Sequence, residues 1–490
     1  MNTRYYSLNR RIAGIGLIAV IGFLGCSKFL DINENPNNPD SAAPSLLLPT
    51  VEAAISQVVG NQFQIYGGIW GQYWAQNVAS SQYQTLEQYN INSSAFNNTW
   101  SILYRSALNN AQLIINDRET ASAEHYKAIA YILKAYAAQL ATDAFGSVPM
   151  SEALNAAGFD NPSYDEQRVV YDSIFQYLDT GIALAQTPNA INPGAQDMLM
   201  GGDMDQWVAF ANTLKLRAYL RLSGVEPQLA QAGIEALYAT NPEFLTTDVS
   251  IEYLTVGGNE NPLYNEMVGL GYTQNLVASA TAVRAFNRNN DPRVFAFYDR
   301  LEGVDTITYL PQGAYNNPDY TGRSYSPPSA LVGARANNPN SATAPVKLIS
   351  EAESYFLQAE AAVRGWGSGD ARALFREGIE ASFRATGLTT ADANTYFAAA
   401  PDAEALFNAD PLKAIITQKY YAMNGFQGFE AWTEWRRTGY PDFLVVSEAS
   451  ILGEGRMPLR FPYPNNEVTS NANFPGLELI YTPVWWDVED

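Results

Sequence analysis

Residues 350–383 read SEAESYFLQAEAAVRGWGSGDARALFREGIEASF, and this stretch decides the fold class. Apolar residues recur at helical spacing in 350–366, and they do so again in 371–383 after the turn GSGD. Small residues stand where two such helices would touch. The stretch therefore predicts two helices that run back against each other across a tight turn.

The predicted helix pair has the length of a tetratricopeptide unit, about 34 residues, although the full consensus of that repeat is absent. Helical periodicity covers much of the remaining chain, and Asp165 and Asp205 stand where two N-caps are expected. The further helical segments are 46–89, 100–116, 123–144, 169–185, 207–224 and 411–421. The sequence predicts a mainly α protein built as a tetratricopeptide-like helix-pair scaffold.

The amino-acid composition changes between about 245 and 348. Gly, Pro, Asn and Tyr are frequent there, as in YLPQGAYNNPDYTGRSYSPPSA, and long apolar periods are few. An irregular stretch of this length is usually functional or disordered, and its tyrosines argue against disorder. We therefore expect one domain over 46–490, in which a loop-rich, ligand-facing insertion packs on the helical scaffold.

The N-terminus has the layout of a signal peptide. Three arginines and no acidic residue accompany the apolar stretch 12–25, which is too short for a bilayer core of about 30 Å. Cys26, the only cysteine, follows directly, and the sequence then turns polar. We expect loss of 1–25, a lipid on Cys26 as the only membrane anchor, and a flexible tether over 26–45. The alternative is a chance cysteine after an ordinary signal peptide.

Composition limits the partners and the chemistry. Loss of three arginines with the signal peptide takes the net charge from −21 to −24, which disfavours nucleic acid and anionic lipid. His125 is the only histidine, so zinc sites of His and Cys and a Ser-His-Asp triad are poor candidates. Neither a cofactor nor a resident metal is expected, although calcium on acidic loops stays open. Paired carboxylates for glycoside hydrolysis also stay open, because the chain has 50 acidic residues.

Aromatic recognition of a polar, neutral ligand is the favoured chemistry, since the chain has 30 Tyr and 9 Trp. Two groups of residues are candidates, and the alternative for each ring is the core. The first group, near a helix end, is Trp70, Tyr73, Trp74, Gln82 and Tyr83. The second group, in the loop-rich stretch, is Tyr272, Tyr309, Tyr315, Tyr320, Arg323 and Tyr325.

Several strings in this order resemble the SusD/RagB family of nutrient-binding outer-membrane lipoproteins, in particular its SusD-like branch, whose substrates are mostly unassigned. The similarity runs along nearly the whole mature chain. The strings are KFLDINENPNNPD (28–40), LLLPTVEAAI (46–55), TDAFGSVPMSEAL (142–154), PSYDEQRVVYDSIF (162–175), WVAFANTLKLRAYLRLSG (207–224), NNDPRVFAFYD (289–299), LISEAESYFLQAEAAVRGW (348–366), GFEAWTEWRRTGYPDF (428–443), RMPLRFPYPNNEVTSN (456–471) and WWD (485–487).

The resemblance implies a fold, a place and a partner. It implies a tetratricopeptide-like scaffold whose loop-rich half binds an oligosaccharide or a peptide between the two groups of aromatics. It implies a lipid-anchored protein on the cell surface that acts as a lid over a SusC-like TonB-dependent transporter. A binding protein is therefore expected rather than an enzyme. The alternatives are a surface hydrolase using paired carboxylates and an architectural lipoprotein that only stabilises the barrel.

Overall fold

The computed structural model describes residues 42–154, 161–453 and 455–488. The predicted signal peptide, Cys26 and nearly all of the tether lie outside these residues. Residues 43–490 form one compact unit. Within the described part of the chain, no helix combines the length and the apolar character needed to span a membrane.

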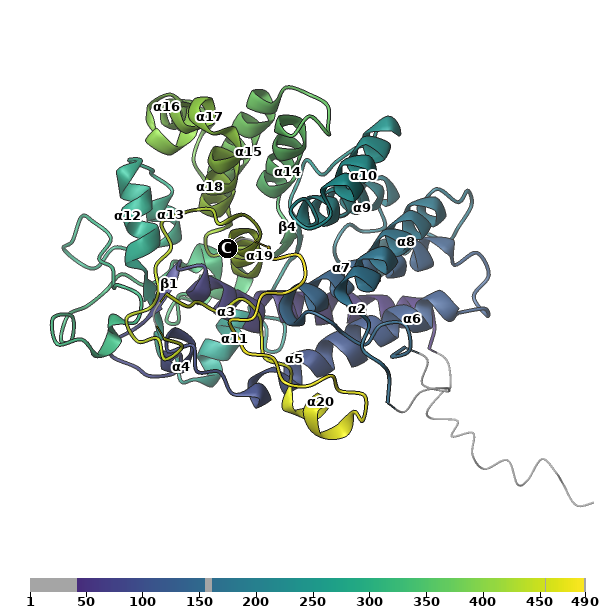
Figure 1. The fold of residues 1–490 in the computed structure, drawn as a ribbon, viewed down its shortest axis with the longest axis horizontal. Coiled ribbons are helices and arrows are strands. Elements are labelled where there is room, and N and C mark those ends of the chain that lie inside the picture. The colour runs from purple at the N-terminus through teal and green to yellow at the C-terminus, as the bar shows by residue number, and fades with distance from the viewer. Residues whose placement is uncertain (1–41, 155–160, 454, 489–490) are drawn as a thin grey trace, which may run out of the picture. The chain divides into compact units, whose positions relative to one another are not determined.

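Helices make up most of this unit. Their bounds are α2 (Pro44–Gly60), α3 (Gln62–Trp70), α5 (Asn97–Ser101), α6 (Asn109–Asn116), α7 (Glu124–Phe145), α8 (Gln167–Ala185), α9 (Met204–Arg221), α10 (Pro227–Ala239), α14 (Glu351–Val363), α15 (Ala371–Ala385), α16 (Thr390–Ala399), α17 (Leu406–Ala409), α18 (Pro411–Met423) and α19 (Gly428–Thr438). The pairs α7–α8, α9–α10 and α14–α15 pack along their lengths and follow one another through the scaffold (Figure 1).

The pair α14–α15 forms as residues 350–383 predict. Ser350 Oγ accepts a hydrogen bond from the amide of Glu353 (3.1 Å), and Asp370 accepts one from the amide of Arg372 (2.9 Å), so each helix starts at a capping side chain. A Cβ on Gly378 would lie 2.6 Å from the ring of Phe356. Glycine at this position therefore allows the two helices to approach closely.

Two predicted N-caps are wrong, although the observed N-cap residues lie close to them in the sequence. Asp203, not Asp205, caps α9, because its Oδ1 accepts from the amides of residues 205 and 206 (3.1 Å each). The N-cap of α8 is Glu166, which makes no side-chain capping bond. Asp165 instead accepts the amides of Met150 (2.8 Å) and Ser151 (2.7 Å), so its carboxylate orders the preceding loop rather than the helix.

Residues 245–348, where the sequence predicts a loop-rich insertion, contain only short helices and strands. The elements of this half are β1 (Trp74–Gln76), α4 (Gln84–Glu87), β2 (Val249–Ile251), α11 (Pro262–Gly269), β3 (Leu276–Ala278), α12 (Ala280–Arg288), α13 (Val294–Phe297), β4 (Val346–Ile349) and, near the C-terminus, α20 (Asn465–Ser470). Strands β1 and β3 form one antiparallel pair, and β2 and β4 form another.

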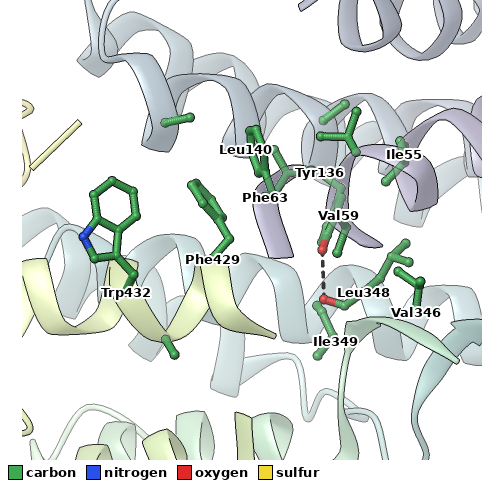
Figure 2. Packing of buried hydrophobic residues seen from close by; sticks show 14 of the residues in the cluster. Ile55, Val59, Phe63, Tyr136, Leu140, Val346, Leu348, Ile349, Phe429 and Trp432 are labelled. Carbon is green, nitrogen blue, oxygen red and sulfur yellow. Dashed lines mark hydrogen bonds between the residues drawn. The ribbon is translucent and has the colours of Figure 1, made fainter. Parts of the chain in front are cut away.

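The hydrophobic core joins the two halves. Figure 2 shows side chains of α2, α3 and α7 packed against β4 and α19. Phe63 and Phe429 lie with ring centroids 4.4 Å apart, and the hydroxyl of Tyr136 donates to the carbonyl of Leu348 (2.8 Å, Figure 2). Side chains far apart in the sequence thus fix the loop-rich half to the scaffold.

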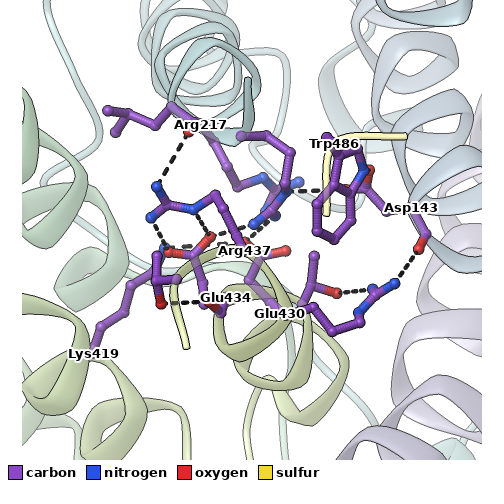
Figure 3. A network of polar contacts seen from close by, with 12 residues as sticks. Asp143, Arg217, Lys419, Glu430, Glu434, Arg437 and Trp486 are labelled. Carbon is purple, nitrogen blue, oxygen red and sulfur yellow. Dashed lines mark hydrogen bonds and ion pairs between the residues drawn. The ribbon is translucent and has the colours of Figure 1, made fainter. Parts of the chain in front are cut away.

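A buried network of ion pairs crosses the scaffold between α9, α14, α18 and α19. Glu434 lies 2.7 Å from Arg437 and 3.3 Å from Lys419 (Figure 3). Arg437 also pairs with Glu360, at 2.7 Å. Arg436 differs, since it donates to backbone carbonyls and lies 3.7 Å above the ring of Trp432.

Candidate functional site

A two-stranded ribbon brings the two predicted groups of residues to one place. Strand β1 pairs with β3, so that Trp74 lies opposite Ala278 and Gln76 opposite Leu276. Beyond the ribbon, the side chain of Asn77 donates to the carbonyl of Gln274 (2.8 Å). The early helix end and the loop after α11 are therefore neighbours, although about 200 residues separate them.

Three of the predicted aromatic residues belong to the core instead. Trp70, Tyr73 and Trp74 are 1%, 0% and 0% exposed, so they offer no ring face to a ligand in this structure. Trp70 Nε1 donates to the backbone carbonyl of Leu86 (3.1 Å), and the hydroxyl of Tyr73 donates to the backbone carbonyl of Tyr420 (2.6 Å). The alternative stated for these rings, a place in the core, is what the structure shows.

Tyr83 and Tyr315 lie beneath the surface as well. The hydroxyl of Tyr83 donates to Glu266 Oε1 (2.6 Å), and burial followed by the charge of Glu266 raises the pKa of this tyrosine. The hydroxyl of Tyr315 accepts from Gln88 Nε2 (2.8 Å). Both rings support the loops above them and are not free to stack on a ligand.

The remaining predicted residues reach the surface. Gln82, Tyr272 and Arg323 are exposed, whereas Tyr309, Tyr320 and Tyr325 are half-buried. We define the loop face as residues 77–82, 270–275 and 315–325. The rings of Tyr320 and Tyr325 pack on a small apolar cluster that Val277 and Val78 share, and the hydroxyl of Tyr325 donates to the carbonyl of Tyr320 (2.8 Å).

Tyr272 is the most exposed ring of the loop face, at 48%. Its backbone is left-handed (φ +57°), which is unusual for an aromatic residue, and its amide donates to the carbonyl of Met267 (2.8 Å). Residues held in such a conformation are concentrated at functional sites. The turn therefore projects an aromatic ring into solvent at some conformational cost.

The sequence did not identify a neighbour of this ring, Tyr264. Partial burial first, and then the charges of Tyr272 and Glu260, raise the pKa of Tyr264. Tyr264 sits in the first turn of α11, in the string PLYNEMVG, where helical periodicity gives no sign of a site. The half-buried Tyr264 thus lies at the start of α11, and the exposed Tyr272 follows the end of the same short helix.

The described residues give little support to metal or carboxylate chemistry. They contain no group of three or more His, Cys, Asp or Glu side chains placed to hold a metal ion. Glu52 and Asp197 form a close carboxyl pair, but both are buried, and burial followed by the charge of Asp197 raises the pKa of Glu52 to about 10. A carboxyl pair enclosed in the scaffold has no route to a polymeric substrate.

Comparison with known proteins settles the family. Residues 36–464 match the SusD-like family described as starch-binding and associating with the outer membrane. The chain belongs to this family. The family is one of binding proteins, which agrees with the prediction of a binding protein rather than a hydrolase. A search of curated proteins found no match.

Solved structures agree with the fold. A chitin-binding protein is 25% identical over 91% of this chain and 100% of its own, with a TM-score of 0.76. A chitin-binding SusD homologue from Flavobacterium johnsoniae is 25% identical over 91% and 98%, with a TM-score of 0.74. A SusD homologue from Bacteroides uniformis is 26% identical over 90% and 99%, with a TM-score of 0.76. These matches confirm the predicted SusD/RagB fold.

Proposed function

We propose that this protein binds oligosaccharides at the loop face and passes them to a SusC-like TonB-dependent transporter in the outer membrane, over which it acts as a lid. The observation that carries the proposal is the exposure of the Tyr272 ring on the loop-rich half of a chain from a starch-binding family. Chitin binding by two of the structural neighbours favours a polymer of this chemical class.

The chemistry of the loop face suits a neutral glycan. Tyr272 in the loop face, and Tyr264 in the adjoining helix α11, offer ring faces to the apolar sides of sugar rings, and each such contact is worth about 0.5–1.5 kcal/mol beyond the buried area. Gln82 and Arg323 are exposed residues of the loop face, and they add hydrogen-bond donors for hydroxyl groups. A few contacts of this strength give weak to moderate affinity, which suits capture followed by release.

The anchor and the tether complete the proposal. A lipid on Cys26 keeps the protein at the membrane, and several acyl chains hold it durably because each buried methylene contributes about 0.8 kcal/mol. The proposed tether starts at Cys26 and ends where α2 begins at Pro44, and its role in the proposal is to let the domain swing about that anchor. The partner is tested by purifying the tagged, lipidated protein from detergent extracts of the native membrane and looking for a barrel protein that co-purifies with it. If no barrel protein co-purifies, the proposed role as a lid is contradicted.

Binding is tested by calorimetry on the protein without its signal peptide. Chito- and malto-oligosaccharides are compared with short cationic peptides, which are the alternative ligands. We expect glycan binding that falls on Tyr272→Ala and stays unchanged on Phe295→Ala, a matched control because Phe295 is 45% exposed outside the loop face. Peptide binding without glycan binding would reject the oligosaccharide assignment, and equal effects of both variants would reject the loop face.

A further inference from the structure

A separate cavity of about 320 Å³ opens where α7 ends and α8 begins, and residues of the C-terminal segment 460–485 also line it. None of its lining residues belongs to the loop face. Ligand sites of small molecules occupy roughly 300–1,000 Å³, so this cavity accommodates about one sugar ring or a molecule of that size.

Arg460 lines the cavity and has an incompletely compensated charge. The side chain is 5% exposed, its guanidinium donates to the carbonyl of Phe145, and its Nε–H is buried without an acceptor. Among the described residues, no carboxylate forms an ion pair with it, whereas the buried Arg221 and Arg437 each pair with acids. A buried charge without a counter-charge is costly, so an anion in the cavity would be stabilised.

The start of α8 adds positive potential at the same place. Glu166 and Gln167 line the cavity, and the N-cap Glu166 makes no side-chain capping bond. The first amides of a helix of 19 residues carry the positive end of its dipole. Gly146, with φ +88°, leaves room for the guanidinium, since a Cβ there would lie 3.1 Å from Arg460 Nη2. Anion-binding features of two independent kinds thus meet in this cavity.

The rim carries exposed charges of both signs, because the exposed Arg168 also lines the cavity and pairs with Glu226 (3.1 Å). Glu166 and Glu478 are exposed carboxylates, and the half-buried Trp485 contributes an aromatic surface. Exposed acids accept hydrogen bonds from hydroxyl groups, and they repel a second negative charge. The ligand that fits therefore has one carboxylate, a compact apolar face and several hydroxyl donors, which is the chemistry of a uronic acid.

We propose that this cavity binds a uronic-acid residue, with its carboxylate on Arg460 and its hydroxyls toward Glu166 and Glu478. The site is additional to the loop face and does not depend on it. A zwitterionic amino acid, with its ammonium at the rim, is the competing occupant. It is disfavoured because ion pairs with exposed acids contribute only about 0–1 kcal/mol.

The test is calorimetry with glucuronate, glucose and N-acetylglycine as probes. We expect glucuronate to bind at least about tenfold more tightly than either of the others, because glucose lacks the carboxylate and N-acetylglycine lacks the hydroxyls. Arg460→Gln should weaken glucuronate at least about tenfold. Arg456→Gln, which removes an exposed arginine of the same segment, should leave it unchanged.

Two further variants keep the proposal falsifiable if Arg460→Gln does not fold. Glu478→Gln keeps an oxygen that accepts from a hydroxyl but removes a negative charge that repels the uronate, so it should strengthen glucuronate binding about two- to fivefold. Tyr272→Ala, in the loop face, should leave glucuronate binding unchanged even where oligosaccharide binding is lost. Equal binding of glucose, equal binding of N-acetylglycine, or a purely structural Arg460 without any glucuronate binding would each overturn the inference.

Discussion

Tyr272 combines an exposed ring with a left-handed backbone, and this combination allows its two roles to be separated by mutation. Replacing it with alanine removes the ring and keeps the unfavourable backbone. Replacing it with glycine removes the ring and also the strain. A left-handed conformation costs an L-residue about 1–2 kcal/mol, and the glycine variant avoids this cost. Glycine also has more conformational freedom in the unfolded chain, which reduces the gain in stability by about 0.4–1 kcal/mol.

The Tyr272→Gly variant should therefore be more stable than Tyr272→Ala by about 0.5–1 kcal/mol. Both variants should lose oligosaccharide affinity by about two- to tenfold, which corresponds to one ring contact of about 0.5–1.5 kcal/mol. Tyr272→Phe keeps the ring and should retain most of the affinity. Urea unfolding measures the stability difference, and calorimetry with the best-bound oligosaccharide measures the affinity.

Two results would refute the reasoning. An alanine variant as stable as the glycine variant would mean that the turn after α11 does not hold Tyr272 in the left-handed region in solution. Unchanged affinity in both variants would mean that the ring does not belong to the binding site. Because the two readouts are independent, either part can fail while the other stands.

Three further predictions concern stability and anchoring. Glu360→Gln should lower the free energy of unfolding in urea by about 3–5 kcal/mol, because it breaks the buried ion pair with Arg437. The control Glu380→Gln, at the surface pair with Arg376, should lower it by less than about 1 kcal/mol. Equal losses of stability would contradict the network. Burial raises the pKa of Glu52 to about 10 from 4.5. The stability that the protonated Glu52 contributes to the free energy of unfolding is therefore fully present below about pH 4.5 and is lost as pH rises toward 10. Glu52→Gln should flatten the decline in unfolding free energy between pH 5 and 8, and an unchanged slope would argue against a protonated Glu52. Cys26→Ala should shift the protein out of the membrane fraction in cells that lack the transporter, and retention there would reject the lipid anchor.

Local patterns in the sequence were sufficient for the helix pairs. Residues 350–383 carry their own caps, turn and small contact residues, so the pair α14–α15 follows from neighbours in the chain. The loop-rich insertion also followed from composition, since Gly and Pro exclude long regular elements. These features depend on interactions over a few residues, and sequence patterns report such interactions well.

The burial of individual rings depends on contacts that the sequence does not display. Trp70 is enclosed because α3 packs closely on α19, where a Cβ on Gly67 would lie 2.2 Å from the amide nitrogen of Phe429. That contact joins segments about 360 residues apart. The same spacing of aromatics on a helix serves a core or a binding surface, so the pattern alone could locate the region of the site and not its exposed members.

The acidic surface makes ionic strength a direct test of which ligand each site takes. The buried charges of Figure 3 pair with one another, so the net charge of −24 expected for the mature chain acts mainly at the surface. Salt screens this field. Added salt should therefore weaken the binding of cationic peptides, leave the binding of neutral oligosaccharides nearly unchanged and reduce the long-range repulsion between the surface and a uronate. A uronate held by the buried Arg460 is itself screened little. Its affinity should therefore stay level or rise with salt, and a steep fall would place it on exposed cations instead.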